Sequence, residues 1–352
     1  MTRAAALSAI SLLLGVAACS DVTQPEPLTQ TPLQAPGSTA DQPGVWEGSG
    51  APAGYRRVDL GGLHGVAMNN GGEVVGSLDG EPVIWRRGKI VPMAGLPGDF
   101  RTEVNDINAR GQVVGSFVDD GGLRRAFLWQ NGEVLDLGTL EGDAEAVAYG
   151  INDGGEVAGV SMGTGHNGFV WRRGEMRPLP DTEVGNSYLV RAINNRGDVV
   201  GASGDVPGFW GSAFRDPQPR ALFTGGESSK AVDVNDARHV VGLSYFDGPS
   251  RNLMAWVWED GTTTVLEILG AEPQPNQDIP LSDVAALNQS GTVVGLAADP
   301  DFHLLPVMWS PPDFEVTVLG EGGRPWDIND RGVIGIDGPD GSYLLMRGGG
   351  RR

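Results

Sequence analysis

The chain has 352 residues, of which 55 are glycine and 24 are proline, and its formal charge is −20 at pH 7. It contains one cysteine, and no basic stripe is visible along it. This composition argues against a nucleic-acid-binding surface and excludes intrachain disulfides, so the fold must depend on its hydrophobic core.

The N-terminus has the composition of a signal peptide. A single basic residue, Arg3, precedes the apolar residues 4–16, a run too short to cross a membrane as a helix. The run ends in Val16-Ala17-Ala18-Cys19, which resembles the lipobox of bacterial lipoproteins, where cleavage precedes a cysteine that is then acylated. We therefore predict a lipoprotein signal peptide at residues 1–18 and lipidation of Cys19, with an ordinary secretory signal as the alternative.

Residues 19–54 are the lipidated cysteine and a tether. They are rich in Pro, Thr, Gln, Ser, Ala and Gly and contain almost no clustered apolar residues, a composition typical of disorder. The predicted location is the bacterial cell envelope, with the protein attached to the membrane by its lipid anchor. Ser20 after the cysteine favours the outer membrane or cell surface over the inner membrane.

Residues 55–352 contain an internal repeat. Its clearest copy is Ile107-Asn108-Ala109-Arg110-Gly111-Gln112-Val113-Val114-Gly115. Self-similarity at a period of about 40 residues indicates a propeller, a solenoid or an array of small units. The asparagines of the seven copies lie 39 to 53 residues apart, at Asn69, Asn108, Asn152, Asn194, Asn235, Asn288 and Asn329.

Each copy is interpreted as a β-hairpin. The asparagine opens the turn, the glycine three residues later supplies a positive φ, and the β-branched pair begins the return strand. The fifth copy has Arg238 in place of this glycine, so its turn is expected to be strained or differently shaped. The seventh copy is one residue short between Asn329 and Gly335.

Two further apolar clusters follow each hairpin. The first is a near-continuous run such as Phe127-Leu128-Trp129, with Ala213-Phe214 taken as its counterpart in the fourth copy. This first cluster is the third strand of the unit. The second cluster, such as residues 134–137, is the fourth strand. Four short strands at this period predict an all-β, seven-bladed β-propeller of four-stranded antiparallel blades.

The ends of the repeat region predict a closed ring. The last unit stops after its third strand, and Arg57-Val58-Asp59-Leu60-Gly61 reads like the missing fourth strand. We predict that this N-terminal strand completes the last blade, which removes the open edges. An open β-solenoid is the structural alternative, but the variable loop lengths and the split last unit argue against it.

The combined pattern is similar to the HAF repeats of bacterial extracellular proteins. The second unit carries it best, from Ile107 through Arg125-Ala126-Phe127-Leu128-Trp129 to Asp136-Leu137-Gly138-Thr139-Leu140. The resemblance spans about residues 55–346 and implies secretion and a propeller-like fold, but no established activity. The histidine that names the family is Arg125 here, so any role shared through that histidine is missing.

Loop lengths vary mainly between the second and third strands and between units. In an up-and-down blade these loops share one face, and variable loops on a rigid scaffold are where binding usually occurs. Aromatic rings beside carboxylates and amides suit sugar or peptide recognition. The candidate binding residues are Phe117, Asp119, His166, Tyr188, Trp210, Tyr245, Phe246, Arg251, Phe302 and His303.

Catalytic and metal motifs are weak. The four histidines lie in four different units, no nucleophile elbow is present, and the Asp-x-Asn stretches lack the closing acid of a calcium loop. We predict no catalytic residues, cofactor or metal. Asp106, Asp233 and Asp327 occupy equivalent positions before the asparagine and could meet across a central channel, as paired carboxylates do in glycoside chemistry.

The sequence therefore favours a monomeric, lipid-anchored propeller that acts as a binding or scaffolding module. Its expected ligand is an envelope glycan, a peptide or a partner protein, with no nucleic acid. The alternative is a propeller enzyme, a glycoside hydrolase or polysaccharide lyase, that uses the channel carboxylates. A structural spacer is a third hypothesis, and it predicts no pocket and no ligand.

Overall fold

The computed structural model of the chain describes residues 45–46, 51–98, 101–182, 187–222, 227–246, 252–271, 281–339 and 341–348. These residues belong to one compact unit, Gln42–Arg352. The predicted signal peptide and Cys19 lie outside the described residues. Within the described part, no helix is long and apolar enough to cross a membrane.

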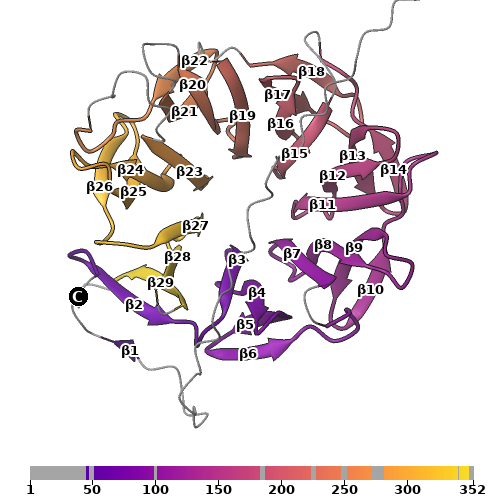
Figure 1. Ribbon diagram of the computed structural model, residues 1–352, viewed down its shortest axis with the longest axis horizontal. Coiled ribbons are helices and arrows are strands. Elements are labelled where there is room, and N and C mark those ends of the chain that lie inside the picture. The colour runs from indigo at the N-terminus through magenta and orange to yellow at the C-terminus, as the bar shows by residue number, and fades with distance from the viewer. Residues whose placement is uncertain are drawn as a thin grey trace, which may run out of the picture. The chain divides into compact units, whose positions relative to one another are not determined.

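Seven antiparallel sheets are arranged around a central axis, and the first strand of each lies innermost (Figure 1). Blade 1 has β3 (His64–Met68), β4 (Val74–Leu78), β5 (Glu81–Arg86) and β6 (Lys89–Pro92). Blade 2 has β7 (Thr102–Ile107), β8 (Val113–Val118), β9 (Arg124–Gln130) and β10 (Glu133–Asp136). Blade 3 has β11 (Glu145–Ile151), β12 (Val157–Met162), β13 (His166–Arg172) and β14 (Glu175–Pro178).

The next three blades repeat this order. Blade 4 has β15 (Ser187–Ile193), β16 (Val199–Ser203), β17 (Val206–Gly211) and β18 (Gln218–Ala221). Blade 5 has β19 (Glu227–Val234), β20 (Val240–Phe246), β21 (Asn252–Glu259) and β22 (Thr262–Val265). Blade 6 has β23 (Ser282–Leu287), β24 (Val293–Ala298), β25 (Leu304–Ser310) and β26 (Glu315–Val318).

Blade 7 joins the two ends of the repeat region. It contains β27 (Arg324–Ile328), β28 (Ile334–Gly338) and β29 (Gly341–Arg347), followed by β2 (Tyr55–Asp59) and the short β1 (Val45–Trp46). β2 pairs antiparallel with β29, from Tyr55 opposite Arg347 to Asp59 opposite Tyr343. The predicted seven-bladed propeller, closed by its N-terminal strand, is therefore confirmed.

The repeated turns have one shape in all seven blades. The Asn108 N–H donates to the Gln112 carbonyl at 3.0 Å, and the Asn329 N–H donates to the Val333 carbonyl at 3.1 Å. The seventh turn therefore has the same length as the others, and Gly335 comes one residue early because it takes the place of Val114 in the strand register. Arg238 keeps the same closure with a φ of 69°, so the fifth turn is strained, as expected, but not differently shaped.

The glycine that ends the Val-Val-Gly motif is explained by strand pairing. Each innermost strand is interrupted by a β-bulge, seen as a register shift in its pairing with the second strand. A Cβ on Gly115 would lie 2.0 Å from the carbonyl oxygen of Glu103 in β7. Five other blades place the equivalent glycine as close to a carbonyl, so a side chain there would force the two strands apart.

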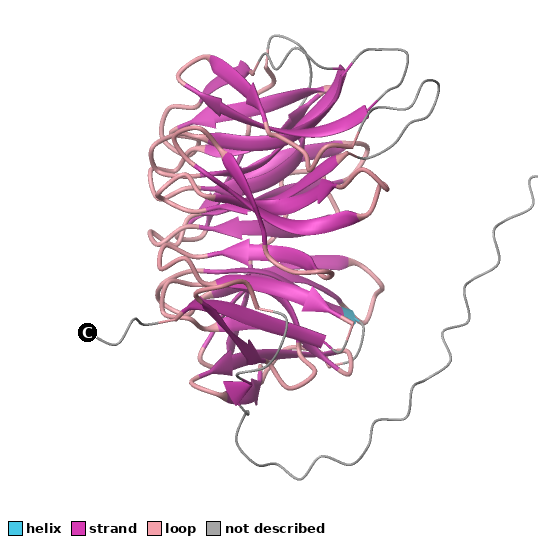
Figure 2. Ribbon diagram, turned by 90° about the vertical axis from the view of Figure 1, so that its left-hand side faces the viewer, coloured by secondary structure: helices cyan, strands magenta, loops and turns pink. Residues whose placement is uncertain are grey.

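The hydrophobic core lies between neighbouring blades. Ile84 of blade 1, for example, packs in one cluster with Val104 and Phe127 of blade 2. Because the faces of each sheet are covered by adjacent blades, the middle strands such as β9, β13 and β24 contain near-continuous buried apolar runs, as the sequence indicated for the third strand. Figure 2 shows the sheets edge-on, with turns and loops gathered at two opposite faces.

Blade 4 departs from the predicted strand boundaries. Its third strand is β17, in which Trp210 pairs with Val199 as Trp129 pairs with Val113 in blade 2. Ala213-Phe214, which we predicted to be this strand, lies in the turn after it. The pattern was misleading because Trp210 is followed by Gly211, which breaks the apolar run that marks this strand in other blades.

Candidate functional site

The first and third turns of each blade share one face, called the turn face here, and the remaining loops share the opposite loop face. On the turn face, the repeated asparagine stabilises its own turn. The Oδ1 of Asn152, for example, accepts from the Glu156 N–H at 2.9 Å. The same contact, four residues along the chain, recurs in all seven blades.

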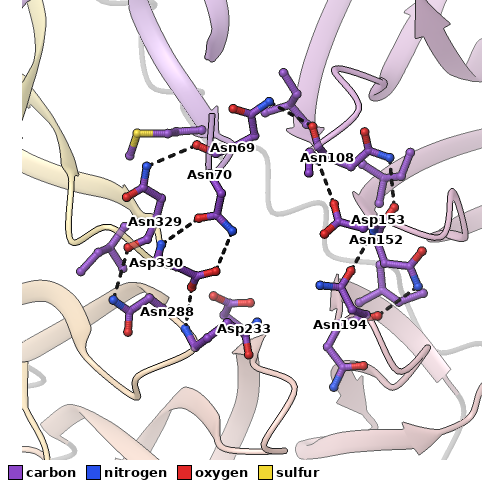
Figure 3. Close-up of a pocket in the computed structure, with 18 of the residues that line it drawn as sticks. Asn69, Asn70, Asn108, Asn152, Asp153, Asn194, Asp233, Asn288, Asn329 and Asp330 are labelled. Atoms are coloured by element: carbon purple, nitrogen blue, oxygen red, sulfur yellow. Dashed lines mark hydrogen bonds between the residues drawn. The ribbon is translucent and has the colours of Figure 1, made fainter. Parts of the chain in front are cut away.

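The seven asparagines also link every blade to the next. The Nδ2 of Asn69 donates to the carbonyl of Asn108 at 3.1 Å, and each following asparagine repeats this contact until the Nδ2 of Asn329 donates back to the carbonyl of Asn69 at 3.3 Å. Figure 3 shows several of these bonds around the central opening. The seven contacts form a closed ring of hydrogen bonds, and each asparagine in it is buried.

The residues that follow the asparagines form a second, outer tier. The Asp153 side chain accepts from the Ala109 N–H at 2.8 Å, and the Asn70 side chain accepts from the Asp330 N–H at 2.9 Å. Six of the seven blade junctions carry such a contact. The seventh junction lacks one because Ala109 has no side-chain acceptor.

Three carboxyl groups form a third tier, and one of them, Asp233, lines the central cavity. Asp106 accepts from the N–H of Ile107 at 2.7 Å and from the N–H of Ile151 in blade 3 at 2.8 Å. Asp233 joins blades 5 and 6 in the same way, and Asp327 joins blades 7 and 1. We call these three residues the clasp aspartates because each uses both oxygens to hold two adjacent blades.

Burial raises the pKa of all three clasp aspartates. It brings the pKa of Asp327 to about 8, with repulsion from Asp233 and Asp106 adding to the shift and backbone donors opposing it. Burial likewise raises the pKa of Asp106 to about 7 and that of Asp233 to about 6. Raised carboxyl pKa values in a cavity are a mark of functional sites, but structural networks produce them too.

The hydrogen bonds favour the structural interpretation of these carboxyl groups. Both oxygens of each one already accept from a backbone N–H at 2.7–2.9 Å, so neither is directed at a substrate. The central cavity beside them has a volume of about 160 Å³, below the ~300–1,000 Å³ of ordinary ligand pockets. Across the described ranges, no three or more acidic, histidine or cysteine side chains are arranged to hold a metal ion.

A larger cavity opens on the loop face between blades 1 and 2. This cleft has a volume of about 920 Å³, and its polar lining includes His64, Asp79, Glu103 and Asn105. Val66, which is 41% exposed, adds an apolar patch to its wall. We call this cavity the blade 1–2 cleft.

The loop of blade 1 beside the cleft is minimal, as is the corresponding loop of blade 4, residues 204–205. Asp79 and Gly80 connect β4 to β5 as a two-residue turn with φ values of 52° and 83°. In blade 2 the corresponding loop spans residues 119–123. A two-residue hairpin of this kind stays close to the ends of its strands and leaves the adjacent wall open.

Two predicted binding residues in blade 2 stabilise their own loop. Asp119 is half-buried and accepts from the N–H groups of Gly121 and Leu123, and its carboxylate pairs with Arg125 at 2.8 Å. These donors hold the pKa of Asp119 below its usual value, with the backbone bond from Leu123 as the largest cause. Phe117 is half-buried and packs at the edge of a core cluster.

Blades 3 and 6 place three predicted residues on the loop face. His166 begins β13 and is exposed. Phe302 is half-buried against a small core cluster under its loop, at a φ of 62°. His303 is exposed, with its Nδ1 3.3 Å from the Asp299 carboxylate.

The structure contradicts the prediction for Trp210. This residue is fully buried in β17, and its indole N–H donates to the Pro180 carbonyl at 2.8 Å. It is therefore a core residue of blade 4 and cannot contact a ligand on the loop face.

The remaining candidates are in blade 5 and in β15. Tyr245 is half-buried in β20. Tyr188 and Phe246 lie in β15 and β20, but their side chains fall outside the described residues, as does Arg251. None of the seven predicted residues whose side chains the structure describes lines the blade 1–2 cleft. The short loop Asp79-Gly80 would not have indicated the cleft, because blade 4 has an equally short loop, Gly204-Asp205, at the same position.

No family model and no curated protein matches the chain. Among solved structures, it is similar to an oligogalacturonate lyase in complex with manganese, with a TM-score of 0.58 and 11% identity over 87% of this chain and 96% of that one. A chain of a mitotic checkpoint complex gives a TM-score of 0.51 and 13% identity over 90% and 97% of the two chains.

The β-propeller domain of the Trilobed protease from Pyrococcus furiosus gives a TM-score of 0.51 and 10% identity over 78% of this chain and 88% of that one. That domain has an open velcro topology, whereas β2 closes blade 7 here. At these identities the similarity shows the β-propeller fold alone. Because enzymes and non-enzymes are both present among the neighbours, the fold does not determine the activity.

Proposed function

We propose that the propeller is a ligand-binding or scaffolding module of the cell envelope and that it meets its ligand in the blade 1–2 cleft on the loop face. The observation that carries the proposal is the cleft itself, whose volume of about 920 Å³ falls within the range of small-molecule sites. The lipid anchor at Cys19 and the tether before residue 55 would hold this module near a membrane.

The lining of the cleft favours a neutral or cationic ligand rich in hydrogen-bonding groups. Asp79 and Glu103 supply carboxylates, and His64 and Asn105 supply groups that can donate hydrogen bonds. Glu103 pairs with Arg124 at 3.0 Å, and the described residues that line the cleft include no arginine or lysine. A neutral oligosaccharide or a peptide fits this chemistry better than a polyanionic glycan.

A thermal-shift screen tests the proposal. Lipid-free protein beginning at residue 20 would be mixed with peptidoglycan fragments, neutral oligosaccharides, polyanionic oligosaccharides and short basic peptides. A ligand at a hundred times its Kd stabilises a fold by ~2.7 kcal/mol, enough to raise the Tm measurably. We expect a shift with a neutral or basic probe and none with the polyanions.

Two histidine variants locate the site. His64→Ala should remove the shift because His64 lines the cleft, whereas His303→Ala changes an exposed histidine on the same face outside the cleft. A shift that survives His64→Ala, or that both variants reduce equally, would place the ligand elsewhere.

The second candidate is a propeller enzyme, a glycoside hydrolase or polysaccharide lyase, that uses the channel carboxyl groups. The raised pKa values of Asp106 and Asp327 favour it, because a carboxyl group that is protonated near neutral pH can act as a general acid. Product analysis of the same probe mixtures would detect turnover. Turnover that is lost in Asp327→Asn, with binding retained, would support the enzyme and exclude a pure binding module.

A further inference from the structure

A second cavity lies on the turn face between blades 3 and 4. It exists because the turn from β17 to β18 spans residues 212–217, where blades 1, 2, 3 and 5 have only two residues between the same strands. The extended turn is fixed to its own blade, since the Ser212 N–H donates to Asp198 at 2.9 Å and the Ala213 N–H donates to the Gly197 carbonyl at 2.8 Å. The cavity beside it has a volume of about 290 Å³.

The lining of this cavity is basic, although the chain as a whole carries a charge of −20. Arg172, Arg196 and Arg215 line it, together with one acidic residue, Glu156. Three guanidinium groups against one carboxylate leave two positive charges at the cavity. Positive charge confined in this way attracts an anion that the rest of the surface repels.

The three arginines differ in how far their charge is neutralised. Arg172 pairs with Glu156 at 3.3 Å. Arg196 lies 3.9 Å from the Asp198 carboxylate, but that carboxylate is already bound by Arg238 through two contacts of 2.8 and 3.0 Å. Arg215 is exposed, and in the described part of the chain no acidic side chain lies within ion-pair distance of it.

Phe214 forms a rigid wall of the cavity. The guanidinium carbon of Arg177 lies 4.3 Å from the centre of the Phe214 ring, and its Nη1 donates to the Phe214 carbonyl at 2.9 Å. Arg172 lies on the same ring at 5.7 Å. These cation–π contacts hold the turn and Arg172 in position before any ligand arrives.

We propose that this cavity binds a small oxyanion, the carboxylate or phosphate group of a low-molecular-weight ligand, through Arg196 and Arg215 with Arg172 at its base. Guanidinium groups match the geometry of carboxylates and phosphates and form charge-assisted hydrogen bonds with them. The cavity is on the opposite face from the blade 1–2 cleft, so this inference is independent of the function proposed for the cleft.

Isothermal titration calorimetry on the purified full-length chain tests this site. The probes are inorganic phosphate, glycerol 3-phosphate and citrate, at constant ionic strength because exposed charges are screened by salt. We expect saturable binding of at least one probe at a single site per chain. Tighter binding of citrate identifies a carboxylate site, and tighter binding of the phosphates identifies a phosphate site.

Arginine variants distinguish binding in this cavity from non-specific attraction of anions to positively charged side chains. Arg215→Ala should weaken binding about tenfold, the effect of ~1.4 kcal/mol, without changing the Tm, because Arg215 has no ionic partner to lose. Arg196→Ala should weaken binding as well. Arg87→Ala removes an exposed arginine from the turn after β5, on the same face of blade 1, and should leave the affinity unchanged.

Two results would overturn the proposal. One is the absence of binding heat for all three probes at millimolar concentration. The other is an equal loss of affinity in Arg215→Ala and Arg87→Ala, which would reflect net charge and not this cavity.

Discussion

The turn face and the loop face of this propeller use polar residues in opposite ways. Around the centre of the turn face, asparagines and aspartates recur from blade to blade, and their side chains are bonded to the next blade. On the loop face, the residues differ between blades and leave a cleft of about 920 Å³. In this repeat protein, repetition of a polar residue from blade to blade marks a structural contact.

The second tier of the turn face refines this rule. The residue after the asparagine is Asp, Asn or Gln in six of the seven copies, and it makes the same contact at all six of these junctions. Any side chain with a carbonyl or carboxylate oxygen at the right reach can accept from the preceding blade's N–H. Variation within a chemical class therefore does not indicate a binding role, whereas the change to Ala109 removes the contact.

The largest expected effect comes from opening the ring. Deletion of residues 55–60 removes β2 and leaves β29 without its outer neighbour. We expect a loss of about 5 kcal/mol or more in the free energy of unfolding, a large share of the ~5–15 kcal/mol of a typical domain. Urea unfolding measures it. A chain that begins at residue 51 keeps β2 and serves as the control, and equal stability of the two chains would refute the role of β2 in closure.

A smaller but local effect should follow from Gly115→Ala. The added Cβ would lie 2.0 Å from the Glu103 carbonyl, so β7 and β8 must separate at the bulge, at a cost of roughly 3 kcal/mol. Gly165→Ala on the loop face meets no atom within 4 Å and should change the stability by less than about 1 kcal/mol. Thermal unfolding of both variants would compare the bulged strand pair with the loop face, and similar Tm values would contradict the role of the glycine in strand pairing.

The clasp aspartates predict a pH dependence. Their folded pKa values of about 8, 7 and 6 exceed the ordinary value of 3.8, so between about pH 4 and pH 8 the folded state binds protons that the unfolded state has released. The free energy of unfolding should therefore fall as the pH rises through this range, by at most about 1.4 kcal/mol per pH unit for each group.

Asp327→Asn should flatten this decline because the amide does not ionise. Asp120→Asn changes an exposed loop-face carboxylate and should leave the slope as in the wild type. Urea unfolding at several pH values measures both slopes. If the slope of Asp327→Asn equals that of the wild type, the clasp carboxyl group does not carry the raised pKa.

The fold was predictable because the sequence repeats the same turn residues and apolar runs in every unit. The Asn-x-x-Gly turn, the apolar third strand and the displaced fourth strand at residues 57–61 each follow from local backbone chemistry and period, and each is present in the structure. The failures arose where a single blade departs from the pattern. Trp210 was assigned to a loop because Gly211 breaks the apolar run. The position of Gly335 suggested that the seventh copy lacks one residue, but β28 pairs with β27 in the usual register.

The sites were much less predictable than the fold. Aromatic and acidic residues in loops were reasonable candidates, but Asp119 caps its own turn and Phe302 packs beneath its own loop. Asp119 finds its partners within its own loop, whereas the clasp aspartates find theirs one blade away, more than forty residues along the chain. The repeat unit alone does not contain that information.

The sequence by itself determined the seven hairpins, the four-stranded blades and the closure by the N-terminal strand, because these depend on turn residues and hydrophobic period. Only the tertiary structure decided which carboxyl groups already accept hydrogen bonds from the backbone and where cavities open. The clasp aspartates, the blade 1–2 cleft and the arginines around Phe214 are products of neighbouring blades packed side by side. Their chemistry comes from distances between blades, which no spacing within one repeat specifies.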